Sequence, residues 1–321
     1  MTQTDNIAAF TRARIDGIRS NVERVLQGKQ DAIRLCLVAL LAGGHVLIED
    51  VPGVGKTLLA KSLAESLGCQ WRRVQFTPDL LPADLVGVNM WDPEAREFTF
   101  HPGPIFANVL LADEVNRASP KTQSALLECM EEAQVSVDGN TFPLAQPFLV
   151  IATQNPFEHE GTYPLPESQL DRFLVRVTMG YPSRDAALRM LDVHTDHADN
   201  HQRLGPVSNP ADVTSLADIA DACYVAPPIK DYVLDIGDAT RADPDVALGV
   251  SPRGCVHLVR AAKAAATLAG RNYVVPDDVK WLAGPVLEHR LALEPEAQIR
   301  GVRAADVLAR VLDSVPVTAR R

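Results

Sequence analysis

A short apolar run at residues 45–49 leads directly into a glycine-bearing turn, and this junction constrains the fold more than any other feature of the sequence. The turn, at residues 50–57, reads Asp-Val-Pro-Gly-Val-Gly-Lys-Thr, and a helix-compatible segment follows at 58–67. A buried strand, a tight loop and a helix N-terminus in this order form a phosphate-binding P-loop, because loop amides and the positive end of the helix surround a polyphosphate. In such a loop Lys56 adds a point charge, and the Thr57 hydroxyl can ligate Mg²⁺.

One position of this motif is irregular. The pattern is usually written G-x-x-x-x-G-K-[ST], and Asp50 stands where the first glycine is expected. The two glycines nearest the phosphate, Gly53 and Gly55, are present, but the motif by itself is incomplete. The residues that we predict to bind phosphate or nucleotide are Pro52, Gly53, Val54, Gly55, Lys56, Thr57 and Leu58.

Two adjacent carboxylates, Asp113 and Glu114, end the apolar segment that starts at Val109. At the carboxyl edge of a parallel sheet, the first can hold Mg²⁺ through water and the second can activate an attacking water as general base. Alone, this pattern is a common strand-to-loop transition. Its position downstream of the P-loop, with a strand and a helix between, favours the catalytic interpretation.

Three further polar residues are candidates for contact with phosphate. Asn155 follows the apolar segment 148–153 and can hydrogen-bond a water and a γ-phosphate, although a turn-forming Asn before Pro is frequent. Arg172 precedes the last predicted strand and could reach a neighbouring subunit's nucleotide; the alternative is a surface Arg paired with Asp171 or Glu167. Arg253 lies in a predicted first helical turn after Ser251-Pro252, which also describes an ordinary helix start.

The order of apolar segments predicts an α/β fold followed by a small all-α domain. Strands are expected at 45–49, 70–76, 107–112, 147–153 and 173–178, with helices at 5–27, 29–42, 56–67 and 120–133. Such alternation implies a five-stranded parallel sheet sandwiched by helices. Helices are then expected at 183–195, 210–222, 229–241, 252–270, 276–290 and 302–313. We place a linker at 196–208, between an α/β domain at 1–200 and a helical lid at 208–321.

Composition narrows the class of protein. The chain of 321 residues is 46% hydrophobic and carries a net charge of −10, which argues against an obligate nucleic-acid binder. Its five cysteines are scattered and contain no C-x-x-C pair, so buried free thiols in a reducing compartment are expected. The longest apolar run, 35–42, is too short to cross a bilayer, and no signal-peptide pattern begins the chain. We therefore expect a cytoplasmic protein.

Taken together, these motifs resemble those of the AAA+ ATPases, and their exact residues resemble the MoxR family more closely still. The segments that carry the closer match are residues 51–57, 101–118, 121–132, 152–156, 165–173 and 251–253. The resemblance covers nearly the whole chain. The resemblance is specific, because several of these segments are not needed by the generic ATPase chemistry.

The resemblance implies a role for each candidate residue. Lys56 would contact the β- and γ-phosphates of ATP, Thr57 and Asp113 would hold Mg²⁺, and Glu114 would activate water. Asn155 looks like sensor 1, Arg172 like a finger acting in trans, and Arg253 like sensor 2, which couples nucleotide state to the lid. Members of the family typically form homo-hexameric rings, act on protein clients, and often work with partners that carry a von Willebrand factor A domain.

Two segments look like insertions in the ATPase core. Residues 84–104 would lie within its second helix, and residues 135–146 read as strand, tight turn and strand, which is typical of a hairpin. Both would sit on one face of a ring and engage a client. The alternative is that they are merely exposed loops.

The sequence is compatible with four functions. The first is an ATP-driven remodelling machine for the maturation, activation or cofactor insertion of partner proteins, and the second is a motor subunit of a magnesium-chelatase-like complex. A nucleic-acid motor is disfavoured by the acidic charge, and nucleotide binding without turnover by the intact acidic pair. A further cluster, His194, His197 and His201 with nearby Asp residues, has metal-ligand spacing but is better explained as a solvated linker.

Overall fold

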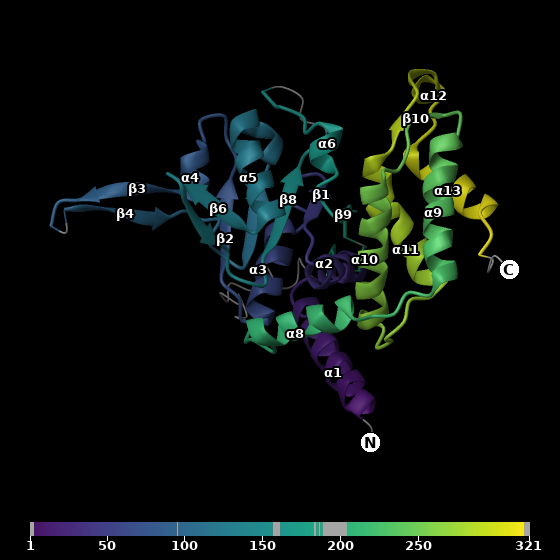
Figure 1. The fold of residues 1–321 in the computed structure, drawn as a ribbon, viewed down its shortest axis with the longest axis horizontal. Coiled ribbons are helices and arrows are strands. Elements are labelled where there is room, and N and C mark those ends of the chain that lie inside the picture. Colours follow the sequence, from purple (N-terminus) through teal and green to yellow (C-terminus); the bar gives the residue numbers. More distant parts are fainter. Residues whose placement is uncertain are drawn as a thin grey trace.

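The structure, a computed structural model, describes residues 3–94, 96–156, 161–182, 184–185, 187–188 and 204–317, with side chains described from residue 9 onward. Two helices, α1 (Gln3–Glu23) and α2 (Gln30–Leu41), precede an α/β core, and a helical lid follows it. Figure 1 shows the core and the lid side by side, with α2 and α10 at the junction between them. The histidine cluster at 194–201 and most of the predicted linker and of the helix at 183–195 lie outside the described residues.

A five-stranded parallel sheet forms the centre of the core, and the predicted fold is confirmed. Its strands stand in the order β2-β5-β8-β1-β9. Their bounds are β1 (Val46–Glu49), β2 (Trp71–Gln75), β5 (Val109–Asp113), β8 (Leu149–Gln154) and β9 (Val175–Val177). Each corresponds to one strand predicted from the sequence.

The strands of the sheet are apolar at successive positions, because both faces of the sheet are covered. Val46 and Ile48 contribute to one apolar cluster, with α1, α2, α3 (Lys56–Ser66) and the lid, whereas Leu47 contributes to the other. That second cluster includes Leu126 and Leu127 of α5 (Pro120–Glu132). The alternation follows from the two-residue period of a strand.

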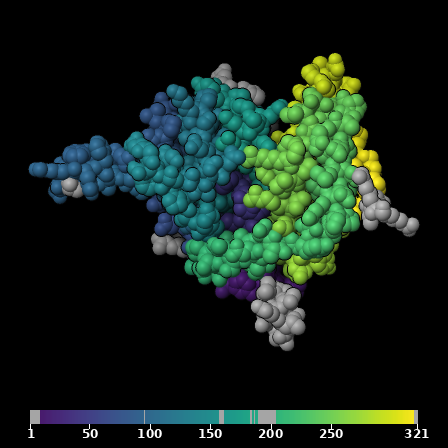
Figure 2. Space-filling view, viewed as in Figure 1, coloured from purple at the N-terminus to yellow at the C-terminus, as the bar shows by residue number. Residues whose placement is uncertain are grey.

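Two antiparallel hairpins interrupt the core where the insertions were predicted. After the short α4 (Pro82–Val86), strands β3 (Gly87–Asp92) and β4 (Glu97–Pro102) project away from the body of the molecule (Figures 1 and 2). Strands β6 (Gln134–Val137) and β7 (Asn140–Pro143) form the second hairpin. Phe100 stacks on Phe142 with 4.1 Å between ring centroids, and Asn89 Nδ2 donates to Asp138 Oδ2 at 2.7 Å. The two hairpins therefore form one unit.

The lid is helical, as predicted, and proline fixes most of its helix starts. Its helices are α8 (Pro210–Asp221), α9 (Pro227–Ala242), α10 (Pro252–Leu268), α11 (Pro276–Leu287), α12 (Pro295–Ile299) and α13 (Ala304–Ser314). All but α13 have Pro in the first turn, where no amide partner is lost. The sequence did not predict α12, nor the two-stranded ladder of β10 (Val246–Leu248) and β11 (Ala292–Leu293). Segments of two and three residues are too short to show a period.

A buried guanidinium joins the lid to the core. Arg290, in the single turn η2 (Glu288–Arg290), donates from Nε to Asp171 Oδ1 at 2.7 Å and from Nη2 to the Phe173 carbonyl at 2.6 Å. It also contacts His257 of α10, and burial together with Arg290 lowers the pKa of His257 to about 3. Burial lowers the pKa of Arg290 itself to about 10. The charge is paired and its donors are used, as a buried cation requires.

The five cysteines are free, as expected, and four of them are buried. Burial raises the pKa of Cys36 and Cys129 to about 12, so neither is a reactive thiolate at neutral pH. Among the described helices, none combines the length and the apolarity that a membrane crossing requires.

Because the imidazole of His45 is buried, we expect the stability of the protein to depend on pH. Its Nδ1 accepts the Val150 amide at 3.0 Å and its Nε2 meets the Met130 carbonyl at 2.9 Å, and burial lowers its pKa to about 4. Below pH 6.5 the unfolded state binds the proton and the folded state does not, so stability is lost as the pH falls. We expect a slope of about 1.4 kcal/mol per pH unit from this residue between pH 6.5 and 4.

Urea unfolding at pH 7, 6 and 5 measures this slope. His45→Gln is expected to make it shallower, whereas replacement of the exposed His101 by Gln is expected to leave it as in the wild type. Equal slopes in the wild type and His45→Gln would contradict the assignment.

Candidate active site

The register of the sheet brings the carboxyl ends of four strands to one edge. Gln75 of β2 lies opposite Asp113 of β5, and Glu49 of β1 lies opposite Gln154 of β8. The loop after β1, the predicted acidic pair and Asn155 therefore begin at the same edge. In open parallel sheets this edge is where ligands bind.

The loop between β1 and α3 has the backbone shape of a phosphate cradle. Gly53 and Gly55 have φ of 82° and 98°, a region that residues with a Cβ rarely adopt. A Cβ on Gly53 would meet nothing within 4 Å, so its conformation and not crowding requires glycine. Exposure varies along the predicted binding residues: Pro52, Gly53 and Leu58 are exposed, Gly55, Lys56 and Thr57 are half-buried, and Val54 is buried.

Lys56 is the first residue of α3, and its ammonium group turns back over the loop. Nζ donates to the Asp50 carbonyl at 2.6 Å. Burial lowers the pKa of Lys56, and the charges of Asp50, Asp113 and Glu114 oppose that shift. The charges of three carboxylates thus act on one cation at this edge of the sheet.

Asp50, the irregular residue of the loop, has a structural role of its own. Its carboxylate is buried and accepts two amides, from Val51 to Oδ1 at 2.8 Å and from Gly180 to Oδ2 at 2.6 Å. Glycine offers neither acceptor. The residue therefore ties the entry of the loop to the segment that follows β9.

Lys29 holds the same segment from the other side. Its buried Nζ donates to the carbonyls of Met179, Gly180 and Tyr181 at 2.8, 2.8 and 3.1 Å. A Cβ on Gly55 would come within 3.9 Å of the Met179 side chain. The turn after β9 is thus packed directly against the phosphate loop.

Asp113 ends β5 and is held by two partners. Thr153 Oγ1 donates to Oδ1 at 2.6 Å, and Arg73 Nη2 donates to Oδ2 at 2.7 Å. Arg73 extends from β2, the strand next to β5. The sequence motifs do not indicate Thr153 or Arg73, because the contact of these residues with Asp113 depends on strand order.

Glu114 has a left-handed backbone, with φ of 58° and ψ of 52°. Gln75 Nε2 donates to its Oε2 at 2.8 Å, and Arg117 Nη1 lies 3.2 Å from the same oxygen. Such a conformation is uncommon outside glycine and costs roughly 1 kcal/mol or more, so the surrounding contacts must hold it. No motif of the sequence indicates Gln75; its register with Asp113 in the sheet is the signal that identifies it.

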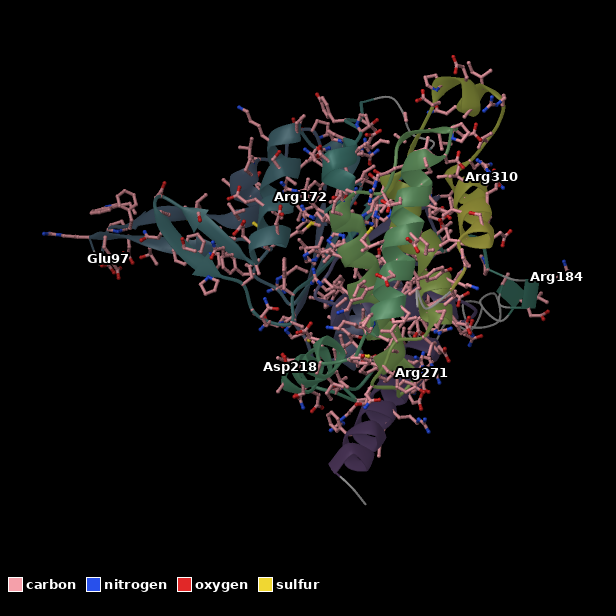
Figure 3. All side chains as sticks on the ribbon, turned by 45° about the vertical axis from the view of Figure 1, so that its right-hand side comes forward. Glu97, Arg172, Arg184, Asp218, Arg271 and Arg310 are labelled. Atoms are coloured by element: carbon pink, nitrogen blue, oxygen red, sulfur yellow. The ribbon has the colours of Figure 1, made fainter. Side chains whose placement is uncertain are left out.

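Arg172 and Arg253 lie at the opposite edge of the sheet. Arg172 precedes β9, and Leu174 donates to the carbonyl of His45, which precedes β1. Both arginines pair with Glu131 at the end of α5, Arg172 Nε at 3.3 Å and Arg253 Nη2 at 3.0 Å. Figure 3 shows Arg172 on the side of the core that faces the lid. Arg172 lies beyond the amino end of β1 and β9, whereas Lys56 follows the carboxyl end of β1, a strand of four residues that rises roughly 3.3 Å per residue. The full length of the strand therefore separates Arg172 from Lys56 of the same chain.

Comparisons with known proteins agree with this architecture. The profile of the ATPase family associated with various cellular activities (AAA) matches residues 45–175, and that of the AAA lid domain matches residues 238–311. Chaperone MoxR1 of Mycobacterium tuberculosis is 43% identical over 92% of this chain and 80% of its own length. The chain belongs to the MoxR family of AAA ATPases.

Two further relatives cover almost the whole chain. The uncharacterized protein YeaC of Bacillus subtilis is 50% identical over 94% of both chains. The crystal structure of a protein from Cytophaga hutchinsonii, described as a candidate ATPase, superposes with a TM-score of 0.92 at 36% identity and 98% coverage of both chains.

Asp50→Asn tests the structural role of the irregular residue. An asparagine amide nitrogen would face one of the two N–H donors, so we expect a loss of about 1–3 kcal/mol in stability and weaker nucleotide binding. Urea unfolding and calorimetric titration with ADP measure the two effects. Asp218→Asn, on the exposed face of α8, is the control. Wild-type values for both quantities in Asp50→Asn would refute the role.

Proposed function

We propose that this MoxR-family ATPase hydrolyses ATP to ADP and phosphate with Mg²⁺, at sites completed by a second copy of the chain, and uses the cycle to remodel partner proteins. The observation that carries the proposal is the separation of the candidate residues between two edges of the sheet. Lys56, Thr57, Asp113, Glu114 and Asn155 belong to the carboxyl edge. Arg172 and Arg253 belong to the amino edge.

The carboxyl edge has the donors that Mg²⁺ and a polyphosphate require. The loop amides, Lys56 and the N-terminus of α3 would bind phosphate oxygens. The Thr57 hydroxyl and the Asp113 carboxylate are hard oxygen ligands, and Mg²⁺ is commonly held by one or two such groups together with phosphate and water. The metal, when bound, neutralises charge on the transferring phosphoryl group.

Glu114 is the group that we propose as general base. Its carboxylate is kept at the strand end by Gln75 and Arg117. Asn155, which follows β8 at the same edge, would orient the attacking water beside it. The left-handed backbone of Glu114 turns this residue out of the strand direction that Asp113 follows.

The amino edge would supply the second half of the site. An arginine that stabilises charge on the phosphoryl group contributes roughly 10³–10⁵ in rate in other NTPases. Because Arg172 is remote from Lys56 of its own chain, it would act on a neighbour's nucleotide. Contacts of this kind are head-to-tail, and repetition of them gives a ring where the rotation closes and an open spiral where it does not. Six subunits, a von Willebrand factor A partner and a cytoplasmic location are proposed from the resemblance to the family.

The paired hairpins are the proposed contact surface for a protein client. Trp91 and Phe98 are 53% and 68% exposed on the projecting β3–β4 hairpin, and their rings meet edge to face at 5.3 Å. Exposed aromatic side chains of this kind are enriched at protein interfaces. The projection leaves the hairpin accessible beyond the body of the ATPase (Figure 2).

A mixing experiment tests the shared site. Glu114→Gln and Arg172→Ala are each expected to bind ATP as the wild type does and to lose hydrolysis by at least about a thousandfold. Mixed in equal amounts, the two variants are expected to regain activity, because each supplies the half-site that the other lacks. Phosphate release in a steady-state assay measures this. A mixture as inactive as its components would remove Arg172 as a finger in trans.

The hairpin is tested in the hydrolysis-deficient background. Proteins retained by immobilised Glu114→Gln with ATP are expected to be lost when Trp91 and Phe98 are both replaced by Ser, while ATP affinity is unchanged. Ile299→Ser, which removes a side chain 86% exposed on α12, is the matched control. Equal retention by all three variants would place the client surface elsewhere.

A further inference from the structure

One carboxylate lies between the two arginines of the amino edge. Glu131 Oε2 is 3.3 Å from Arg172 Nε, and Glu131 Oε1 is 3.0 Å from Arg253 Nη2. Each oxygen has its own guanidinium, so the position of one carboxylate sets the distance between the two cations. Arg172 belongs to the core and Arg253 to the lid, so this carboxylate also bridges the two parts of the molecule.

The carboxylate is mounted on a rigid support. Glu131 is in the last turn of α5, whose neighbouring residues Leu127 and Met130 are buried. The Met130 carbonyl is bonded to the buried His45 ring. The backbone that carries Glu131 is therefore fixed at the junction of α5 with the sheet, and its carboxylate is held from the other end by the two arginines.

The lid side of the bridge is also fixed. Arg253 Nε lies 3.9 Å from Asp171 Oδ2, and Asp171 Oδ1 accepts from the buried Arg290 at 2.7 Å. Ser251 caps α10 by accepting the Gly254 amide at 3.1 Å, which orients the turn that carries Arg253. Both arginines remain partly exposed, at 31% and 43% of their side-chain surface. Each guanidinium has five donors, so the contact with Glu131 leaves others for a second oxyanion.

We propose that Glu131 is a positioning residue that holds Arg172 and Arg253 side by side as one pair for the phosphate of a nucleotide bound to a second copy of the chain. The inference rests on the proposed function, because it takes Arg172 to act in trans. Long arginine side chains lose rotamer entropy when they are ordered. Glu131 orders them before the phosphate arrives, and it makes the pair depend on the position of the lid.

Glu131→Gln is the variant that tests this role, because it keeps the size of the side chain and removes the charge. We expect kcat to fall roughly tenfold or more, since small displacements of a catalytic group have effects of this size. The KM for ATP and the dissociation constant for ADP are expected to stay at wild-type values, because the arginine pair is proposed to act on the charge of the transferring phosphoryl group in the transition state and not on the bound ground state. Glu131→Asp, which keeps the charge, is expected to retain more activity than Glu131→Gln.

Glu128→Gln is the matched control. Glu128 lies one turn earlier on α5 and lines the same surface hollow of about 240 Å³ as Glu131 and Arg172. Within the described part of the chain it has no ion pair with either arginine. Its replacement removes the same charge from the hollow without breaking the bridge, so wild-type kcat is expected. Thermal unfolding of all variants separates a loss of fold from a loss of positioning.

Mixing assigns Glu131 to one half of the shared site. Glu131→Gln is expected to regain activity with Glu114→Gln and to gain nothing with Arg172→Ala. Wild-type kcat in Glu131→Gln, an equal loss in Glu128→Gln, or recovery with Arg172→Ala would overturn the inference while leaving the proposed function intact. Failure of Arg172→Ala to recover with Glu114→Gln would instead refute the shared site on which both rest.

Discussion

A parallel strand carries its two ends to opposite edges of the sheet, and the arrangement of this molecule depends on that constraint. The residues that follow β1, β5 and β8 meet at the carboxyl edge, so the phosphate loop, the acidic pair and Asn155 share one location. The residue that precedes β9 lies at the other edge, beside the end of α5 and the lid. Arg172 is fixed to that edge by its place next to β9, so the sheet keeps it away from the phosphate loop of its own chain. The proposed function, in which Arg172 acts on the nucleotide of a second copy, follows from this separation.

The lid is attached at the edge that carries the arginines. Arg290 enters the core between Asp171 and Phe173, directly around Arg172 in the chain. The cation is accompanied by His257 and His289, whose pKa values are lowered by burial and by Arg290, so the imidazoles add no second charge there. Movement of the lid would act first on the residues that flank Arg172. The segment at the phosphate loop is held independently, by Asp50 and Lys29 on the turn after β9.

Much of this could be predicted from the sequence because the signals are local. The apolar runs, the glycines of the loop and the Asp113-Glu114 pair each follow from a few consecutive residues. The five strands and the insertions at 84–104 and 135–146 were found in this way. Partners that belong to another strand could not be found, since Gln75, Arg73 and Thr153 meet the acidic pair only because β2 and β8 flank β5. The β10–β11 ladder was not predicted either, because its strands are too short to show a period and lie more than forty residues apart.

By itself, the sequence determined the class of fold, the phosphate loop and the identity of the candidate catalytic residues. The period of apolar residues, the chemistry of turns and the spacing of motifs are all properties of residues close together in the chain. Only the tertiary structure decided how these residues are grouped. It gave Asp50 a role, as the acceptor for the amide of Gly180, 130 positions away in the chain. It also showed that Arg172 and Arg253 both pair with the carboxylate of Glu131. Strand order and the docking of the lid set these contacts, and both depend on burial of apolar surface between segments distant in the chain.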